Sequence, residues 1–242
     1  MVGRLLPLLA GLLLGGMASA HDHHAVSDAP KVDYAKVWLE KQQTAPRLAV
    51  AATFDATGRL WLARVVGQQI FVSQSADAGR SFAEAVAVNR EPELISADGE
   101  ARPQIAAIGQ RIYVSWTQAL PQPFAGHIRL AVSDDGGKTF GEPLTVNDDT
   151  RPITHRFNAM LADTRGVTLA WIDKRDGAGN PDYTGAAIYT ARSTDGGRSF
   201  ETNRKLADHS CECCRIALAV DTDGTPVALW RQVFGQSTRD FA

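Results

Sequence analysis

Ser133-Asp-Asp135-Gly-Gly137-Lys-Thr139-Phe140 is one of three octets in this chain that fit Ser-x-Asp-x-Gly-x-Ser/Thr-Phe. The other two are Ser75-Ala-Asp77-Ala-Gly79-Arg-Ser81-Phe82 and Ser193-Thr-Asp195-Gly-Gly197-Arg-Ser199-Phe200. Their first residues lie 58 and 60 positions apart, a period typical of stacked or radial repeat architectures. In each octet the carboxylate can accept backbone N–H groups in a tight turn, the glycine supplies a positive φ, and the aromatic ring enters a core. The octets therefore predict hairpin turns with a structural role.

The repeat continues on both sides of the octets. A tryptophan recurs once per period, and the four are Trp61, Trp116, Trp171 and Trp230. An arginine lies 14 or 15 residues before each tryptophan, and these four are Arg47, Arg102, Arg156 and Arg215. The intervals are apolar stretches broken by a turn, which predicts strand, turn, strand. A third strand before each octet (128–132, 187–191) and a fourth after it would complete a four-stranded propeller blade.

Three octets at blade spacing resemble the Asp-boxes, or bacterial neuraminidase (BNR) repeats, of the sialidase superfamily. The resemblance covers about residues 46–242 and implies an all-β fold, a six-bladed β-propeller of which about three and a half blades are present. A fourth octet would begin between positions 244 and 252, beyond Ala242. We therefore expect a C-terminally truncated piece of a longer propeller. The alternative is that a partner protein or an N-terminal strand completes the last sheet.

The first 45 residues differ in composition from the repeats. Residues 1–20 combine a basic start at Arg4, an apolar run and a small-x-small end, the pattern of a cleaved Sec-type signal peptide. We therefore expect a periplasmic or secreted protein in an oxidising compartment. Residues 21–45 are a polar leader that opens with His21-Asp22-His23-His24. This tract can bind Cu(II) or Ni(II), or it is a disordered tail.

Composition excludes two classes of partner. The formal net charge is −2 and no lysine- or arginine-rich run is present, so we expect no nucleic-acid partner. The apolar run near the N-terminus is short, and no later stretch approaches the ~20 apolar residues of a membrane span. With 44% hydrophobic residues, the chain can bury a sizeable core.

The four recurring arginines are candidate substrate-binding residues. The first strand of a propeller blade lines the central channel, so Arg47, Arg102, Arg156 and Arg215 would form part of a ring around one mouth. Clustered guanidinium groups favour a carboxylate or phosphate, which predicts an anionic glycan or another small anionic ligand. In the alternative, each arginine pairs with a local carboxylate, as Arg102 would with Glu100.

The resemblance to sialidases implies exo-α-sialidase activity, but the catalytic residues of that family are not found. Its first arginine stands in an aromatic-Arg-Ile-Pro motif, where this chain has Pro46-Arg47-Leu48-Ala49. Its acid/base aspartate lies in a loop that is Arg64-Val-Val-Gly-Gln-Gln69 here, without an acid. Its tyrosine nucleophile and glutamate partner come from late blades, and no residue here matches them. Hydrolysis is therefore left open, and a non-catalytic propeller scaffold is the alternative.

The longest and most polar loop between strands follows Trp171. It carries Asp173, Lys174 and Arg175 at the expected rim of the arginine pocket. Because such groups can act as general acids or bases, Asp173 is the candidate catalytic residue. The alternative is a solvated, glycine-rich loop.

All three cysteines fall in His209-Ser-Cys211-Glu-Cys213-Cys214, so that Cys214 holds the place before Arg215 that His155 holds before Arg156. We expect a disulfide, first of all between Cys211 and Cys214, with one thiol left over. The alternative is a soft-metal site in which thiolates and His209 or His155 bind copper or zinc. A glycan-binding or scaffold role requires no cofactor. A periplasmic metal or redox protein is the third functional hypothesis.

Overall fold

The computed structural model describes residues 32–33, 36–37, 40–41, 49–98, 100–235 and 238–242. The expected signal peptide, the tract His21–His24 and Arg47 lie outside these residues. The chain divides into one unit, Met1–Val32, and a second unit, Asp33–Ala242, which holds all the named strands and is described here. Among the described residues, no helix has the length and apolar character needed to cross a membrane.

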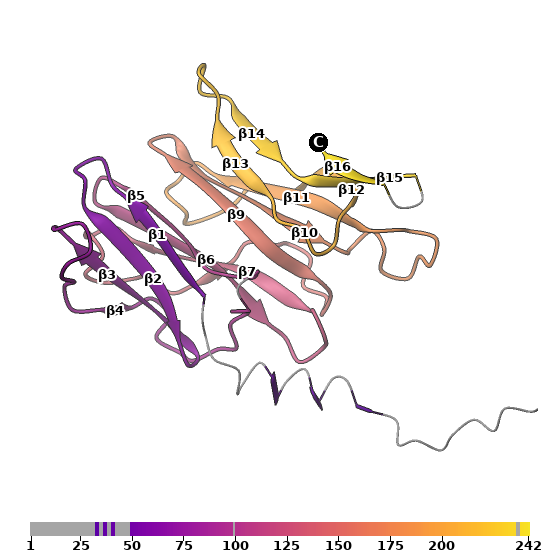
Figure 1. The fold of residues 1–242 in the computed structure, drawn as a ribbon, viewed down its shortest axis with the longest axis horizontal. Coiled ribbons are helices and arrows are strands. Elements are labelled where there is room, and N and C mark those ends of the chain that lie inside the picture. Colours follow the sequence, from indigo (N-terminus) through magenta and orange to yellow (C-terminus); the bar gives the residue numbers. More distant parts are fainter. Residues whose placement is uncertain (1–31, 34–35, 38–39, 42–48, 99, 236–237) are drawn as a thin grey trace, which may run out of the picture. The chain divides into compact units, whose positions relative to one another are not determined.

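Antiparallel sheets dominate the second unit (Figure 1). The first blade contains β1 (Val50–Phe54), β2 (Leu60–Val66), β3 (Gln69–Ser75) and β4 (Val86–Ala87) in that order. The second contains β5 (Gln104–Ile108), β6 (Arg111–Ala119), β7 (Gly126–Ser133) and β8 (Leu144–Thr145). The third contains β9 (His155–Asp163), β10 (Gly166–Asp173), β11 (Ala186–Ser193) and β12 (Arg204–Ser210). Each blade is a meander of four neighbouring strands, as the repeat predicts.

The fourth repeat is divided between two sheets. β13 (Ala217–Val220) and β14 (Pro226–Leu229) pair only with each other among the described strands. β15 (Arg231–Phe234) and β16 (Thr238–Phe241) form a hairpin that joins the third blade, where Gln232 pairs with Ser210 of β12. β16 therefore lies at the outer edge of the sheet that contains the third blade.

The first strands of the repeats are neighbours in chain order. β1 contacts β5, β5 contacts β9, and β9 contacts β13. Radial succession of first strands is the arrangement of blades around the axis of a propeller. The fold is thus an all-β propeller built from four-stranded blades.

Hydrophobic cores form between successive blades. In β2, buried positions alternate with partly buried or exposed ones, the period expected when a strand presents one side chain in two to a core. Trp61 of the first blade packs in one cluster with Val114 of the second. Leu130 of the second blade packs with Trp171 of the third, and Ile188 of the third with Ile216. Apolar burial between blades is therefore the main stabilising contact of the fold.

The octets form the expected turns. In each, the serine Oγ donates to the aspartate Oδ1 over 2.7 Å, and that oxygen accepts the backbone N–H four residues after the aspartate. The glycines at the fifth position of the octets have positive φ values of 89°, 78° and 85° at Gly79, Gly137 and Gly197. The conserved geometry of the three copies explains why the residue types recur.

The aromatic residues of the second and third octets pack toward the preceding blade. Phe140 is buried in the core between the first and second blades, and Phe200 packs against the core between the second and third. Phe82, in the first blade, is 43% exposed, so the expectation of a buried ring is wrong for this copy. The part of the chain that the structure describes contains no blade before β1 that could cover it.

Candidate functional site

The segments that link successive blades are held at one end of the strands. Ile95, in the link to the second blade, pairs with Gln118 at the end of β6. In the last repeat Ser210 pairs with Gln232, which again lies two residues after a tryptophan. His155 pairs with Asp173 in the third blade. The structural counterpart of His155 is therefore Ser210, which corrects the expected correspondence with Cys214.

A cavity of about 680 Å³ lies at this end of the blades. Its wall is built from connections rather than from strand centres: the β6–β7 connection, the start of β9, the β10–β11 loop and the links before β5 and β13. The side chains that line it include those of Asp98, Glu100, Phe124, Arg156, Phe157, Lys174, Tyr183, Glu212 and Cys213. A concave site with aromatic walls and a few polar groups is the usual form of a small-molecule binding site.

Arg156 is the buried cation of this cavity, with 4% of its surface exposed. Its Nη2 lies 3.1 Å from Oδ2 of Asp98, and burial lowers the pKa of its guanidinium. The guanidinium carbon lies 4.7 Å from the ring centroid of Phe157 and 5.5 Å from that of Phe124. Arg156 is therefore fixed by one carboxylate and two aromatic rings.

A bulge in β9 brings Arg156 and Phe157 to the same cavity. Phe157 has a positive φ of 57°, and the β9–β10 register shifts between Ala170 and Ile172. In a regular strand, consecutive side chains point to opposite faces. A bulge removes this alternation, which allows both neighbours to line one wall.

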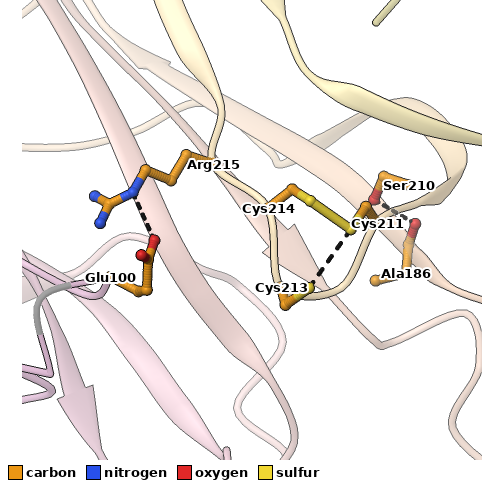
Figure 2. The surroundings of a disulfide bond; sticks show 7 residues. All are labelled: Glu100, Ala186, Ser210, Cys211, Cys213, Cys214 and Arg215. Carbon is orange, nitrogen blue, oxygen red and sulfur yellow. Dashed lines mark hydrogen bonds and ion pairs between the residues drawn. A yellow bond between two sulfur atoms is a disulfide. The ribbon is translucent and has the colours of Figure 1, made fainter. Parts of the chain in front are cut away.

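Two further ion pairs stand around the cavity. Nε of Arg215 lies 2.8 Å from Oε2 of Glu100, and Figure 2 shows these two side chains pointing toward each other. Nζ of Lys174 lies 2.7 Å from Oε2 of Glu212. With the Arg156–Asp98 pair, three cations face three carboxylates. The local charge is therefore balanced.

The predicted arginines come together only in part. Arg102 and Arg215 line a small hollow of about 70 Å³ together with Glu100, which also lines the large cavity. Arg156 belongs to the large cavity, and Arg47 lies outside the described residues. Glu100 pairs with Arg215, whereas the sequence suggested Arg102 as its partner.

Asp173 is completely buried and does not line the cavity. Its Oδ2 accepts hydrogen bonds from Nε1 of Trp171 at 2.8 Å and from Nε of Arg175 at 3.0 Å. Nε2 of His155 lies 3.7 Å from the same oxygen. This burial argues against the expected acid/base role, because a dissolved substrate does not reach the carboxylate. The surroundings of Asp173 are those of a structural acceptor.

Arg175 extends the same buried network toward the outside. Its Nη1 donates to Oδ1 of Asp148 over 2.7 Å, and its guanidinium lies 4.0 Å from the ring centroid of Tyr189. Burial and the neighbouring Asp176 raise the pKa of Tyr189 to about 12. The loop after Trp171 is therefore ordered by contacts at its base.

The cysteine run forms a turn beside the cavity. Cys211 and Cys214 are joined by a disulfide, and Cys213 is an exposed free thiol on the cavity wall. Its Sγ lies 3.6 Å from Sγ of Cys211 (Figure 2). His209 is directed elsewhere, since its Nδ1 donates to the Thr184 carbonyl over 2.8 Å.

Sequence reasoning missed Asp98, Glu212 and Phe124 as cavity residues, and it named Glu100 only as a local partner of Arg102. Asp98 and Glu100 lie in the link before β5, Glu212 lies in the link before β13, and Phe124 lies in the β6–β7 connection. The sequence signal that could have identified these acids is that they occur in the link before the first strand of a repeat, in two different repeats. Spacing counted from the tryptophans does not detect it, because these links differ in length.

No family model and no curated protein matches the sequence. Among solved structures, a protein of unknown function from Dyadobacter fermentans matches with a TM-score of 0.55 and 17% identity, over 78% of this chain and 58% of that chain. The α-L-arabinofuranosidase Arb93A from Fusarium graminearum matches with a TM-score of 0.54 and 14% identity, over 79% and 58%. The NanB sialidase from Streptococcus pneumoniae matches with a TM-score of 0.48 and 10% identity, over 74% and 26%.

The match to Arb93A shows that the fold is shared with a glycan-active propeller enzyme. The chain is therefore a β-propeller in fold. It spans just under three fifths of the length of the Dyadobacter and Fusarium structures, at 58% of each.

Proposed function

We propose that this chain binds a glycan in the cavity around Arg156. The observation that carries the proposal is the combination of rings and polar groups in one cavity: Phe124, Phe157 and Tyr183 stand beside Asp98 and Glu212. Aromatic rings offer flat apolar faces to the C–H groups of a sugar, and carboxylates accept hydrogen bonds from its hydroxyls. The glycan-active structural neighbours support the same function.

The paired charges favour an uncharged saccharide. Arg156, Arg215 and Lys174 each already face a carboxylate, so an anionic ligand would have to displace one. Hydroxyl groups can instead bond to the remaining lone pairs and N–H groups of these pairs. The Fusarium arabinofuranosidase was solved with arabinobiose, an uncharged disaccharide, which agrees with this preference.

An anionic glycan is the second candidate, and the small hollow is the observation that favours it. Arg102 and Arg215 line this hollow together with Glu100, which is paired with Arg215. Glu100 is 64% exposed and can swing into solvent. A ligand carboxylate that replaced it would then contact two guanidinium groups.

We propose binding rather than hydrolysis. A glycosidase needs a carboxyl group held in its protonated form as the general acid. All three acids of the cavity face cations, and Asp173 is buried in another network. We also propose that the protein acts outside the cytoplasm, on the basis of residues 1–20 alone.

The test is calorimetric titration of the full chain with arabinobiose and with sialyllactose, each at low and high salt. We expect the uncharged sugar to bind with little dependence on salt, and a fluorogenic sialoside to remain uncleaved. Tighter, salt-sensitive binding of sialyllactose would select the Arg102–Arg215 hollow instead. Failure of both sugars to bind would reject the proposal for these glycan types.

A further inference from the structure

We propose that the reduced form of the Cys211–Cys214 turn binds one Cu(I) ion through the sulfur atoms of Cys211, Cys213 and Cys214. This inference is independent of glycan binding. It rests on the arrangement of the three sulfurs, on the position of the third thiol and on the partners of the surrounding residues.

The sulfur atoms are already grouped at metal-binding distance. All three lie within 4.8 Å of one another, and those of Cys211 and Cys213 are 3.6 Å apart. With metal–sulfur bonds of about 2.3 Å, sulfurs that share one ion stand roughly 4 Å apart. Opening the disulfide therefore leaves three ligands that need only small movements to surround an ion.

A structural disulfide does not account for the third thiol. The bridge spans a sequence separation of only 3, and closing so short a loop restrains the unfolded chain less than closing a long one. Cys213 takes no part in the bridge, yet it is exposed on the wall of the large cavity. That position gives an ion a path from solvent to the cluster.

The number and type of ligands favour Cu(I) over Zn(II). Thiolates are soft ligands that select Cu(I), and structural zinc sites have four protein ligands. Among the described residues, the group of potential ligands at this turn consists of the three sulfurs, without His209 or His155. His209 is held by the Thr184 carbonyl and by stacking on Tyr183, with ring centroids 5.1 Å apart.

The turn is anchored on both sides of the cluster. The Cys211 N–H donates to the Arg231 carbonyl over 2.8 Å, which fixes the turn to β15. Glu212, between two of the cysteines, is paired with Lys174 of the β10–β11 loop.

The site forms only after reduction. Two small thiols transfer two electrons and two protons to the Cys211–Cys214 disulfide, which gives two protein thiols and one disulfide of the reductant. Cu(I) then replaces the protons of the three thiols, and three protons enter solution. A small-molecule disulfide that accepts two electrons from the Cys211 and Cys214 thiolates re-forms the bridge and leaves as two thiols after taking up two protons. This removes two ligands and releases the ion, so the turn is a redox-gated site.

The experiment is an anaerobic titration of the full chain with Cu(I), in competition with a chromophoric Cu(I) chelator, before and after reduction by dithiothreitol and its removal. We expect the reduced chain to take one Cu(I) per molecule from the chelator and the oxidised chain to take none at this turn. Cys213→Ser, whose fold is checked by thermal unfolding, should lower the affinity at least tenfold.

Two control variants separate this cluster from histidine sites. His209→Ala should bind Cu(I) as the wild type does, and so should a chain with alanine at His21, His23 and His24. The proposal is overturned if the reduced wild type takes no Cu(I) or if Cys213→Ser binds it equally well. Retention of Zn(II) in preference to Cu(I) would also overturn it.

Discussion

The indole N–H of Trp171 donates a 2.8 Å hydrogen bond to Oδ2 of Asp173, two residues further along β10. Trp230 makes the same bond to Oε1 of Gln232 at 2.9 Å. Trp61 and Trp116 also donate to side-chain oxygens, those of Asp55 and Glu93. Because an uncharged glutamine serves in one repeat, the fold needs an acceptor oxygen beside each tryptophan rather than an acid.

Asp173→Ala should destabilise the fold strongly. The substitution leaves the Trp171 N–H and the Arg175 guanidinium, which is 14% exposed, without their shared acceptor. Removal of one partner of a buried ion pair typically costs about 3–5 kcal/mol. Urea unfolding at neutral pH measures this loss, and Asp173→Asn, which keeps one acceptor oxygen, should lose less.

The matched control is Asp182→Ala in the exposed part of the same loop, where we expect a change of at most about 0.5 kcal/mol. If Asp173→Ala were as stable as this control, the structural role of Asp173 would be wrong. If the Asp173→Asn variant were fully folded but no longer bound sugar, Asp173 would have a functional role at the cavity.

Acid should weaken the octet turns. Hydrogen bonds from Ser81 and Ser75 lower the pKa of Asp77 from 3.8 to about 2, and the same bonding lowers the pKa of Asp135 and Asp195. Groups with a depressed pKa in the folded state stabilise it above the unfolded value, and this contribution disappears as the pH falls from 3.8 toward 2.

Asp77→Asn tests this pH dependence, since it removes one of the titrating groups. Thermal unfolding between pH 2 and pH 6 should show a smaller loss of stability on acidification for the variant than for the wild type. Superimposable pH profiles would mean that the Asp77 carboxylate contributes nothing through its charge.

Most of the fold can be predicted from the sequence because its signals are local. The octet turns depend on residues at most four positions apart, and strand alternation is visible within one strand. The bulge at Phe157 has no such signal. It arises where β9 pairs with β10. The distance in sequence to the following tryptophan makes Arg156 the equivalent of Arg102, but only Arg156 is buried in the structure.

Gly137→Ala should cost more than a positive φ alone explains. The backbone at Gly137 has a φ of +78°, and an added Cβ would lie 2.7 Å from Cζ3 of Trp61 in the preceding blade. The left-handed conformation costs about 1–2 kcal/mol for alanine, and overpacking adds about 1–3 kcal/mol. Urea unfolding should therefore show a loss of about 2–5 kcal/mol.

Gly109→Ala is the control for the backbone contribution. Its φ is +62° and nothing lies within 4 Å of an added Cβ, so only the conformational cost of about 1–2 kcal/mol remains. Equal losses in the two variants would show that the octet does not pack against Trp61 as the structure has it.

Alkylation should detect one thiol before reduction and three after it. Cys213 is exposed, while Cys211 and Cys214 are joined. Intact mass spectrometry after treatment with a maleimide reads the number directly, and peptide mapping should place the first label on Cys213. A first label on Cys211 or Cys214 would contradict this pairing.

The candidate site was harder to predict than the fold because it is assembled from separate connections. Asp98, Phe124 and Glu212 belong to three of them, and their proximity depends on how the blades follow one another. The arginine spacing identified Arg156 and Arg215, but their carboxylate partners decide the charge of the cavity. Ion pairs between distant segments leave no spacing signal in a single sequence.

Comparison of Phe124→Ala with Phe82→Ala tests glycan binding in the cavity most directly. Both rings are exposed, at 55% and 43%, but only Phe124 lines the cavity. Loss of a stacking ring worth about 1.4 kcal/mol weakens binding about tenfold. Titration with arabinobiose should therefore give a Kd about tenfold higher for Phe124→Ala and an unchanged Kd for Phe82→Ala. Equal affinity of the two variants and the wild type would place the binding site elsewhere and contradict the proposed function.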